Sequence, residues 1–193
     1  MKIIHQEYQK TKIKKIVNNL KALLFTTLFA LLIISCNKDD DKPPLTELEK
    51  LPPATQIGAN TFGCLLDGVA FKPGVTNNSY NCFYQLVNGE YFFLVTAKNT
   101  RNNIVESVFV GTEKQTISQG QTLSLIERTD GNAWGTYFLN TEPFTTNALK
   151  TGELKITKLT NQIVAGIFWF DVLDTNGVTH QIREGRFDMQ YTN

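Results

Sequence analysis

From Thr61 onward, the chain consists of short runs rich in β-branched and aromatic residues, separated by turns that contain Gly or Asn. The clearest pair of runs, residues 81–87 and 90–97, flanks Asn88-Gly89. Both turn residues accept a positive φ, as a type I′ turn requires, so this segment predicts a β-hairpin. The same pattern predicts strands over residues 62–66, 69–71, 103–111, 121–127, 133–139, 153–159, 162–173, 178–183 and 186–191.

We expect an all-β domain of about nine or ten strands, with no helix longer than two turns. The connections are mostly short, so the strand order should be mainly antiparallel. An antiparallel β-sandwich is the expected architecture, and a partly open β-barrel is the alternative. Residues 162–173 are apolar on both faces. Such a strand is central in its sheet, covered by other chain, or part of a binding surface.

The N-terminus has the organisation of a secretory signal peptide, which we place at residues 1–35. Six Lys precede an uncharged stretch, residues 22–34, of sequence ALLFTTLFALLII. A helix that spans a bilayer needs roughly 20 apolar residues, so this stretch is too short for one. A basic segment followed by a short apolar segment is instead typical of a signal peptide.

The sequence Ile33-Ile34-Ser35-Cys36 resembles a bacterial lipobox. We therefore expect Cys36 to be lipidated and, after cleavage, to become the first residue of an outer-membrane lipoprotein. Several acyl chains on one residue would anchor the protein stably, because each buried CH₂ contributes roughly 0.8 kcal/mol. The alternative is a core helix that ends in a chance cysteine.

Three carboxylates, Asp39, Asp40 and Asp41, follow the cysteine closely. An acidic run at this place resembles the signal that sends Bacteroidota lipoproteins to the cell surface. The alternatives are a solvated spacer and a periplasmic location. Residues 36–60 contain four prolines and little periodic pattern, so we read them as an extended spacer before one β domain, residues 61–193.

Charge argues against nucleic acid as a partner. Residues 1–35 hold six of the 19 basic residues but only one of the 18 acidic residues, so the remainder of the chain is mildly acidic. A protein that binds nucleic acid usually carries a basic patch or stripe. With 41% hydrophobic and 19% charged residues, the chain has enough apolar material for one sizeable core.

Two stretches resemble an uncharacterised family of small Bacteroidota lipoproteins. The first is LPPATQIGANTFGC at residues 51–64, followed by Asp67-Gly68-Val69-Ala70-Phe71, and the second is Gly185-Arg186-Phe187-Asp188. The resemblance implies an exported lipoprotein with a β domain, and it implies no activity. From the residues themselves, we expect the first stretch to lay the spacer against the domain.

The sequence predicts no catalytic residue, metal site or cofactor. His180 is the single histidine of residues 36–193, and no nucleophile elbow, phosphate-binding loop or zinc-ligand spacing is present. Asp171 and Asp188 form a weak candidate for the carboxylate pair of a glycosidase. Asp174 and Asn176 faintly resemble a calcium loop, but a plain turn fits them better.

Two cysteines, Cys64 and Cys82, remain in the exported part of the chain. In such a domain they could form a disulfide, and the alternative is two buried thiols.

Aromatic side chains give the best indication of function. We take Trp134, Trp169 and Tyr137 as possible ligand contacts, and Trp134, between Ala133 and Gly135, as the ring most expected at the surface. The alternative is that all of these rings are core residues. The favoured function is a non-enzymatic binding module for a glycan, a peptide or an outer-membrane protein.

Two other functions stay open: a structural subunit of an envelope assembly and, with less support, a hydrolase. A shallow groove with an exposed Trp favours the binding module, and a pocket with convergent carboxylates favours the hydrolase. A flat apolar patch without a pocket favours the assembly subunit.

Overall fold

The computed structural model describes Lys14, Val17, Lys21, residues 43–75 and residues 78–192. The lipidation site Cys36, the acidic run Asp39–Asp41 and nearly all of the expected signal peptide lie outside the described residues. By its internal contacts the chain divides into Met1–Pro44 and Leu45–Asn193, and the fold below is that of the second unit. Within the described residues, no helix is long and apolar enough to cross a membrane.

Eleven strands form a single, mostly antiparallel sheet, which confirms the all-β prediction. The strand order is β2-β1-β11-β10-β9-β6-β7-β5-β4-β3, and β8 pairs with β7 outside this path. The strands are β1 (Thr61–Leu66), β2 (Val69–Phe71), β3 (Tyr80–Val87), β4 (Glu90–Arg101), β5 (Ile104–Thr112), β6 (Thr122–Leu125), β7 (Ala133–Leu139), β8 (Glu142–Thr145), β9 (Gly152–Leu159), β10 (Ile163–Leu173) and β11 (Thr179–Gln190).

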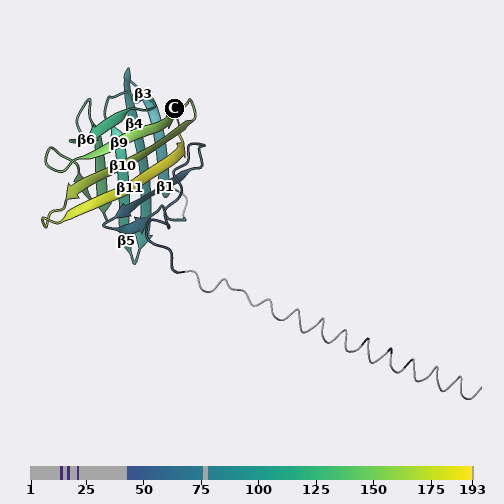
Figure 1. Ribbon diagram of the computed structural model, residues 1–193. Helices are drawn as coiled ribbons and strands as arrows, with labels where there is room; N and C mark the ends of the chain where they lie inside the picture. The colour runs from purple at the N-terminus through teal and green to yellow at the C-terminus, as the bar shows by residue number, and fades with distance from the viewer. Residues whose placement is uncertain (1–13, 15–16, 18–20, 22–42, 76–77, 193) are drawn as a thin grey trace, which may run out of the picture. The chain divides into compact units, whose positions relative to one another are not determined.

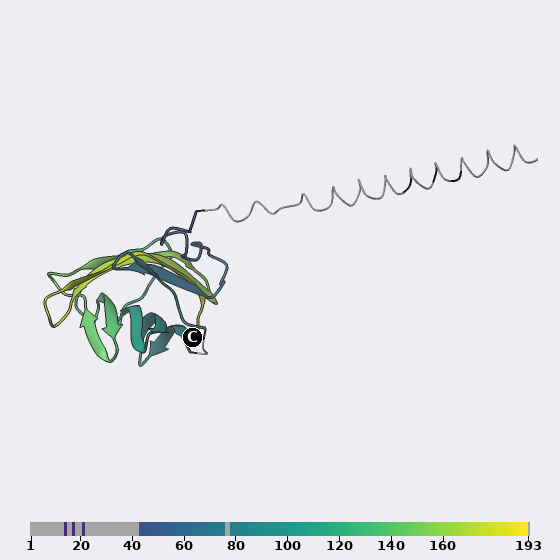
Figure 2. The ribbon, with the colours of Figure 1, turned by 90° about the horizontal axis from the view of Figure 1, so that it is seen from below.

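The sheet folds into two layers. Figure 1 shows β1, β9, β10 and β11 crossing in front of β3, β4 and β5 at a large angle. The view in Figure 2 shows the same strands as two layers, one above the other. Large crossing angles are typical of orthogonally packed sheets, whose strands can pass from one layer to the other at a corner. The arrangement is consistent with both the expected sandwich and the partly open barrel.

The two layers are joined at two corners. At one corner β6 pairs with β9 in the first layer and, through the parallel pair Leu125–Ala133, with β7 in the second. At the other corner Thr192, just after β11, forms a parallel bridge to Phe83 of β3. The Tyr84 amide donates to the Thr192 carbonyl at 3.1 Å. This bridge covers part of the edge of β3, where unpaired backbone groups would otherwise be exposed.

The core lies between the layers and consists of large apolar side chains from both. The rings of Phe93, on β4, and Phe187, on β11, pack across the interior with their centroids 6.0 Å apart. On β10 the side chains of Phe168, Phe170 and Val172 are buried and face the core. The opposite face of the same strand carries the exposed side chains described in the next subsection.

The turn residues in the sequence predicted the ends of several strands correctly. Asn88 and Gly89 have φ values of 52° and 85°, and they join β3 to β4 as predicted. The sequence missed β8, which contains Pro143. It also divided residues 178–191 into two strands, whereas β11 is one strand whose pairing with β10 is interrupted by a bulge between Phe168 and Phe170. Glu184, at φ 53°, lies in this irregular part of β11.

Residues 51–60, the docked segment, pack on the outer face of the first layer through the buried carboxylate of Asp188. This side chain is on β11 and only 1% exposed. It accepts four hydrogen bonds, from Thr55 Oγ1 at 2.6 Å and from the amides of Ile57, Gly58 and Ala59 at 2.9, 2.7 and 3.2 Å. Part of the expected spacer is therefore bound to the domain, as anticipated for the motif at residues 51–64.

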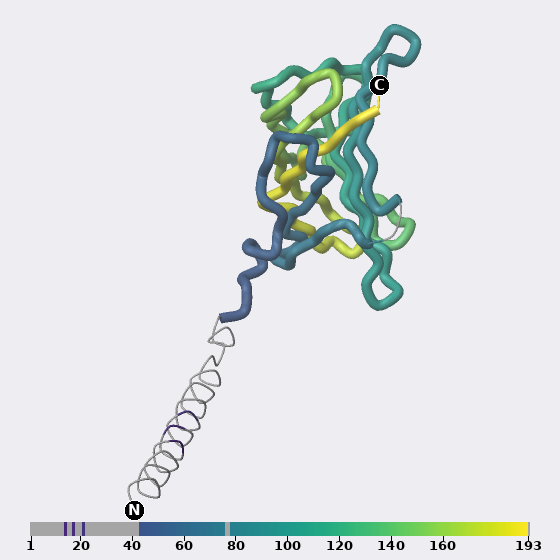
Figure 3. Tube along the Cα trace, turned by 90° about the vertical axis from the view of Figure 1, so that its right-hand side faces the viewer, coloured from purple at the N-terminus to yellow at the C-terminus, as the bar shows by residue number. Residues whose placement is uncertain are grey.

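Further contacts hold the docked segment in place. Gln190 donates from Nε2 to the carbonyl of Gly58 at 3.1 Å, and its amide donates to Asn60 Oδ1 at 2.9 Å. Gly63 allows close packing, because a Cβ there would lie 2.6 Å from Pro52. Figure 3 shows this part of the chain, in dark blue, against the outer side of the layer that holds the yellow C-terminal strand.

We predict that Asp188→Asn lowers the free energy of unfolding by about 2–3 kcal/mol, because the amide cannot accept every bond and leaves buried N–H groups unpaired. Burial opposes ionisation of Asp188, but its hydrogen bonds outweigh that effect and hold the pKa below the ordinary value of 3.8. The stabilisation is therefore present above pH 3.8 and is lost as the pH falls through the lowered pKa of the folded state.

Urea unfolding of the parent and of Asp188→Asn between pH 2.5 and 7 measures both effects, and the difference between the two proteins should shrink below about pH 4. Asp130→Asn, at an exposed carboxylate, is the matched control and should change stability by less than about 0.5 kcal/mol. A difference that stays constant down to the lowest pH would contradict the assigned role of the charge.

Candidate functional site

A shallow groove lies on the outer face of the first layer, beside the docked segment. Its volume is about 450 Å³. The lining comes from β9, β10, β11 and the docked segment, and comprises Ala54, Glu153, Ile167, Phe168, Trp169, Arg183, Glu184, Gly185 and Arg186.

Two apolar side chains of β10 are exposed in this groove. Trp169 is 41% exposed and Ile167 is 44% exposed. The neighbouring outward position on the same strand, Ala165, is fully buried, and it is paired in register with Asp188, beneath the docked segment. The docked segment therefore covers the outer face of β10 at Ala165 and leaves Ile167 and Trp169 exposed. Ala54 of this segment forms the edge of the groove.

Arg183, on β11, holds a fixed position over Trp169. Its guanidinium carbon lies 5.3 Å from the centre of the indole ring. The same group forms an ion pair with Asp171 at 2.7 Å and donates to the carbonyl of Phe170 at 3.1 Å. A planar cation held by these partners loses little further entropy when a ligand binds.

The remaining polar groups of the groove carry both signs of charge. Arg186 pairs with Glu184 at 3.2 Å and also donates to the Glu184 carbonyl. Glu153 lies opposite Trp169 in the register of β9 and β10. The groove therefore offers one exposed aromatic face, donors on two arginines and acceptors on two glutamates, with no large net charge.

Of the three aromatic residues predicted as ligand contacts, only Trp169 lies at the surface. The expectation that Trp134 is the ring most exposed at the surface is wrong, because this side chain is 2% exposed and lies beneath Arg128, whose guanidinium carbon is 4.2 Å from the ring centre. The prediction for Tyr137 is also wrong. Its ring is 2% exposed and packs inside the domain against His180, with centroids 5.0 Å apart.

The predicted disulfide between Cys64 and Cys82 is not formed, and both residues are free, buried thiols. Their strands are not neighbours: β1 lies between β2 and β11, whereas β3 is at the opposite end of the strand order. Burial raises the pKa of both thiols above the ordinary value of 9.0. A buried, protonated thiol is a poor nucleophile and acts here as a small apolar side chain.

The titratable residues considered for chemistry have structural partners. Asp171 binds Arg183 and Asp188 binds the docked segment, so the two carboxylates do not face a common cleft. His180 contacts Asp67 through Nδ1 at 2.7 Å. Asp174 accepts the amides of Asn176 and Val178 and forms a plain turn. Among the described residues, no group of three His, Cys, Asp or Glu side chains could hold a metal ion.

Sequence reasoning missed Arg183, Arg186 and Ala54 as residues of the groove. Arg186 lies in a predicted strand, but its place beside Ile167 in the groove depends on the pairing of β10 with β11. The contribution of Ala54 depends on the docking of its segment to Asp188 and had no local signal.

Comparisons with protein-family models, curated proteins and solved structures found no match to this chain.

We predict that Cys64 and Cys82 stay unreactive toward a thiol reagent in the native protein and react together on unfolding without a reductant. Mass spectrometry of a Cys36→Ala variant, which contains only these two thiols, measures this directly. Two labels after unfolding and none before are expected. Finding no label in the unfolded, unreduced protein would show that the disulfide forms.

Proposed function

We propose that this protein is a non-enzymatic binding module that takes its ligand in the groove around Trp169. The exposed indole ring beside the fixed guanidinium of Arg183 is the observation that carries the proposal. A large apolar ring left uncovered on a sheet face, with polar groups held around it, is what a recognition surface requires. The shallow form of the groove favours binding over catalysis.

A neutral glycan is the ligand class that fits the groove best. The C–H face of a sugar can lie on an aromatic ring, while its hydroxyl groups need both donors and acceptors. Arg183 and Arg186 supply donors, and Glu153 and Glu184 supply acceptors. Because Arg183 and Arg186 are already paired with carboxylates, the groove has little excess charge with which to select an ionic ligand.

The other functions have weaker support. A hydrolase needs convergent carboxylates at a pocket, whereas Asp171 and Glu184 in and beside the groove are each paired with an arginine. A structural subunit needs a flat apolar patch, whereas Ile167 and Trp169 are interspersed with charged side chains.

We also propose that the protein is anchored through Cys36 and presented on the cell surface. The lipobox-like sequence before Cys36 and the acidic run that follows it support this location. A glycan-binding module would there meet polysaccharides from outside the cell.

We predict that Trp169→Ala lowers the affinity for a neutral oligosaccharide at least about tenfold, which corresponds to 1.4 kcal/mol. Maltohexaose, cellohexaose and xylohexaose are suitable first probes, and isothermal titration measures binding. Leu149→Ala is the matched control, because Leu149 is 91% exposed and is not part of the groove lining. Equal binding by both variants would place the glycan elsewhere, and no binding of any neutral glycan would contradict the ligand class.

We predict that Cys36→Ala releases the protein from the membrane fraction, because the lipid-bearing residue is removed. Replacing Asp39, Asp40 and Asp41 together by Ala should keep the anchor but protect the domain from protease added to intact cells. Immunoblots of fractionated and protease-treated cells measure both effects. A Cys36→Ala protein that stays in the membrane would contradict the anchor, and an unprotected triple variant would contradict the export signal.

A further inference from the structure

The outer face of the second layer carries apolar side chains where a solvated sheet face carries polar ones. Phe83, Leu94, Gly111 and Trp134 form one row across β3, β4, β5 and β7, as the pairing registers show. Phe92, next to this row on β4, points to the same side as Leu94. An antiparallel sheet with one wet face normally alternates apolar and polar residues, so this face requires a separate explanation.

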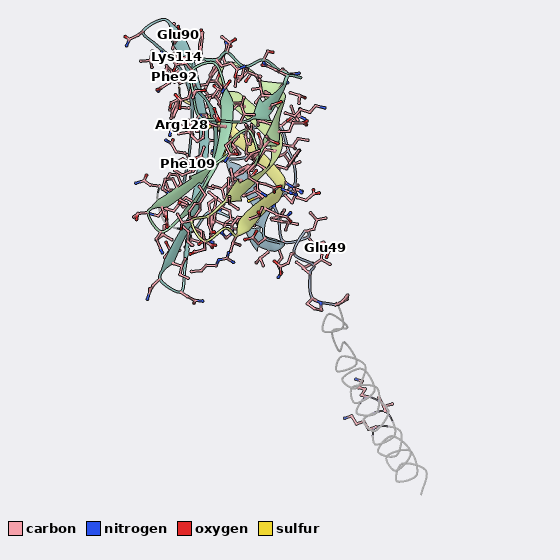
Figure 4. The ribbon with its side chains drawn as sticks, turned by 90° about the vertical axis from the view of Figure 1, so that its left-hand side faces the viewer. Glu49, Glu90, Phe92, Phe109, Lys114 and Arg128 are labelled. Carbon is pink, nitrogen blue, oxygen red and sulfur yellow. The ribbon has the colours of Figure 1, made fainter. Side chains whose placement is uncertain are left out.

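A second groove runs along this row. Its volume is about 290 Å³, and it is lined by Phe83, Gln85, Val87, Phe92, Phe93, Leu94, Thr112, Glu113, Arg128 and Trp134. Figure 4 shows Phe92, Arg128 and Phe109 along one side of the domain, away from Glu49 of the N-terminal part. Phe83, Phe92 and Leu94 are each partly exposed, so their apolar surfaces are accessible from solvent.

Trp134 forms one wall of the groove and has an unpaired donor. Gly111 leaves room for the indole, since a Cβ there would lie 3.2 Å from Trp134 Cζ2. The indole Nε1 is buried and has no hydrogen-bond partner among the described residues. Leaving a buried donor unpaired destabilises the folded protein, so a ligand that accepts from it recovers this loss.

Arg128 covers the ring without being fixed there by the core. Its guanidinium lies 4.2 Å from the ring centre and pairs with Glu113 at 2.6 Å, while 57% of its side chain is exposed. The cation–π contact and the ion pair of this exposed side chain are both weak interactions, so the side chain can move aside at small cost. The Glu113 partner neutralises the charge of Arg128, and the groove therefore has no strong preference for an anion.

We propose that this groove is a second ligand site, which binds a small uncharged molecule with an apolar ring or branched chain and one acceptor oxygen. The apolar part lies against Phe83, Phe92 and Leu94. The oxygen accepts a hydrogen bond from Trp134 Nε1 after Arg128 moves off the ring. The volume suits a molecule of this size, because a cavity of about 150 Å³ already holds benzene.

The second site is independent of the groove around Trp169. The two grooves share no lining residue, and they lie on the outer faces of different layers. The ligand classes also differ: the first groove offers several charged donors and acceptors around one ring, whereas the second offers several apolar side chains and one unpaired donor.

Acetophenone is a suitable probe, because it combines a ring with one carbonyl oxygen. In a ¹⁵N-labelled Trp169→Phe protein, Trp134 gives the single indole N–H signal, since the chain has two Trp residues. We expect acetophenone to move this signal downfield and to saturate it. Isopropylbenzene, which replaces the oxygen by carbon, should bind at least about fivefold more weakly at matched concentrations.

Two variants test the assigned contacts. Trp134→Phe keeps a ring but removes the donor, so acetophenone and isopropylbenzene should then bind equally, as measured by ligand-observed NMR. Leu94→Gln, at a partly exposed position, should weaken both probes at least threefold while the protein keeps its unfolding midpoint.

Three outcomes would overturn the proposal. The first is an unmoved Trp134 signal with acetophenone, the second is equal binding of the two probes by the Trp169→Phe protein, and the third is tighter binding of benzoate than of acetophenone. The last would show that Arg128 selects an anion.

Discussion

The buried carboxylate of Asp188 is the interaction on which the surface of the first layer depends. A charge in this position is tolerated only because four donors from residues 55–59 satisfy it. The domain and the docked segment therefore stabilise each other: without the segment, Asp188 would be a solvated side chain on a partly apolar sheet face.

The groove around Trp169 follows from the same contact. The docked segment covers Ala165 and borders the groove at Ala54. It leaves the adjoining part of β10 exposed to solvent. The outer face of β10 is apolar for two different reasons. At Ala165 it is covered by the docked segment, and at Trp169 it carries the exposed ring of the groove. The second layer has no comparable cover in the described part of the chain, which is why its outer apolar row forms a groove of its own.

The sequence predicted features that depend on residues adjacent in the chain. It missed features that depend on which strands pair and on the register of their pairing. Asn88-Gly89 specified a hairpin by its own backbone preferences, and the apolar residues on both faces of β10 indicated a strand that is central, covered or part of a binding surface. Trp134, by contrast, was expected at the surface because its neighbours Ala133 and Gly135 are small. Its burial results from Gly111 on the paired strand β5 and from Arg128, in the loop just before β7, whose guanidinium lies over the ring. Both contacts depend on how the chain folds back, so the small neighbours alone did not reveal them.

The same distinction applies to two stretches that carry distinctive motifs, residues 51–64 and 185–188. The residues that pair across these stretches are 129–133 positions apart in the sequence. In the fold they are one unit, because Thr55, Ile57, Gly58 and Ala59 of the first bind Asp188 of the second. Without the first stretch, the carboxylate of Asp188 would lose its four donors and its cover, and without Asp188 the amides of the first stretch would lose their acceptor. The pair of motifs is therefore a structural requirement of this fold, and it implies nothing about which ligand the two grooves bind.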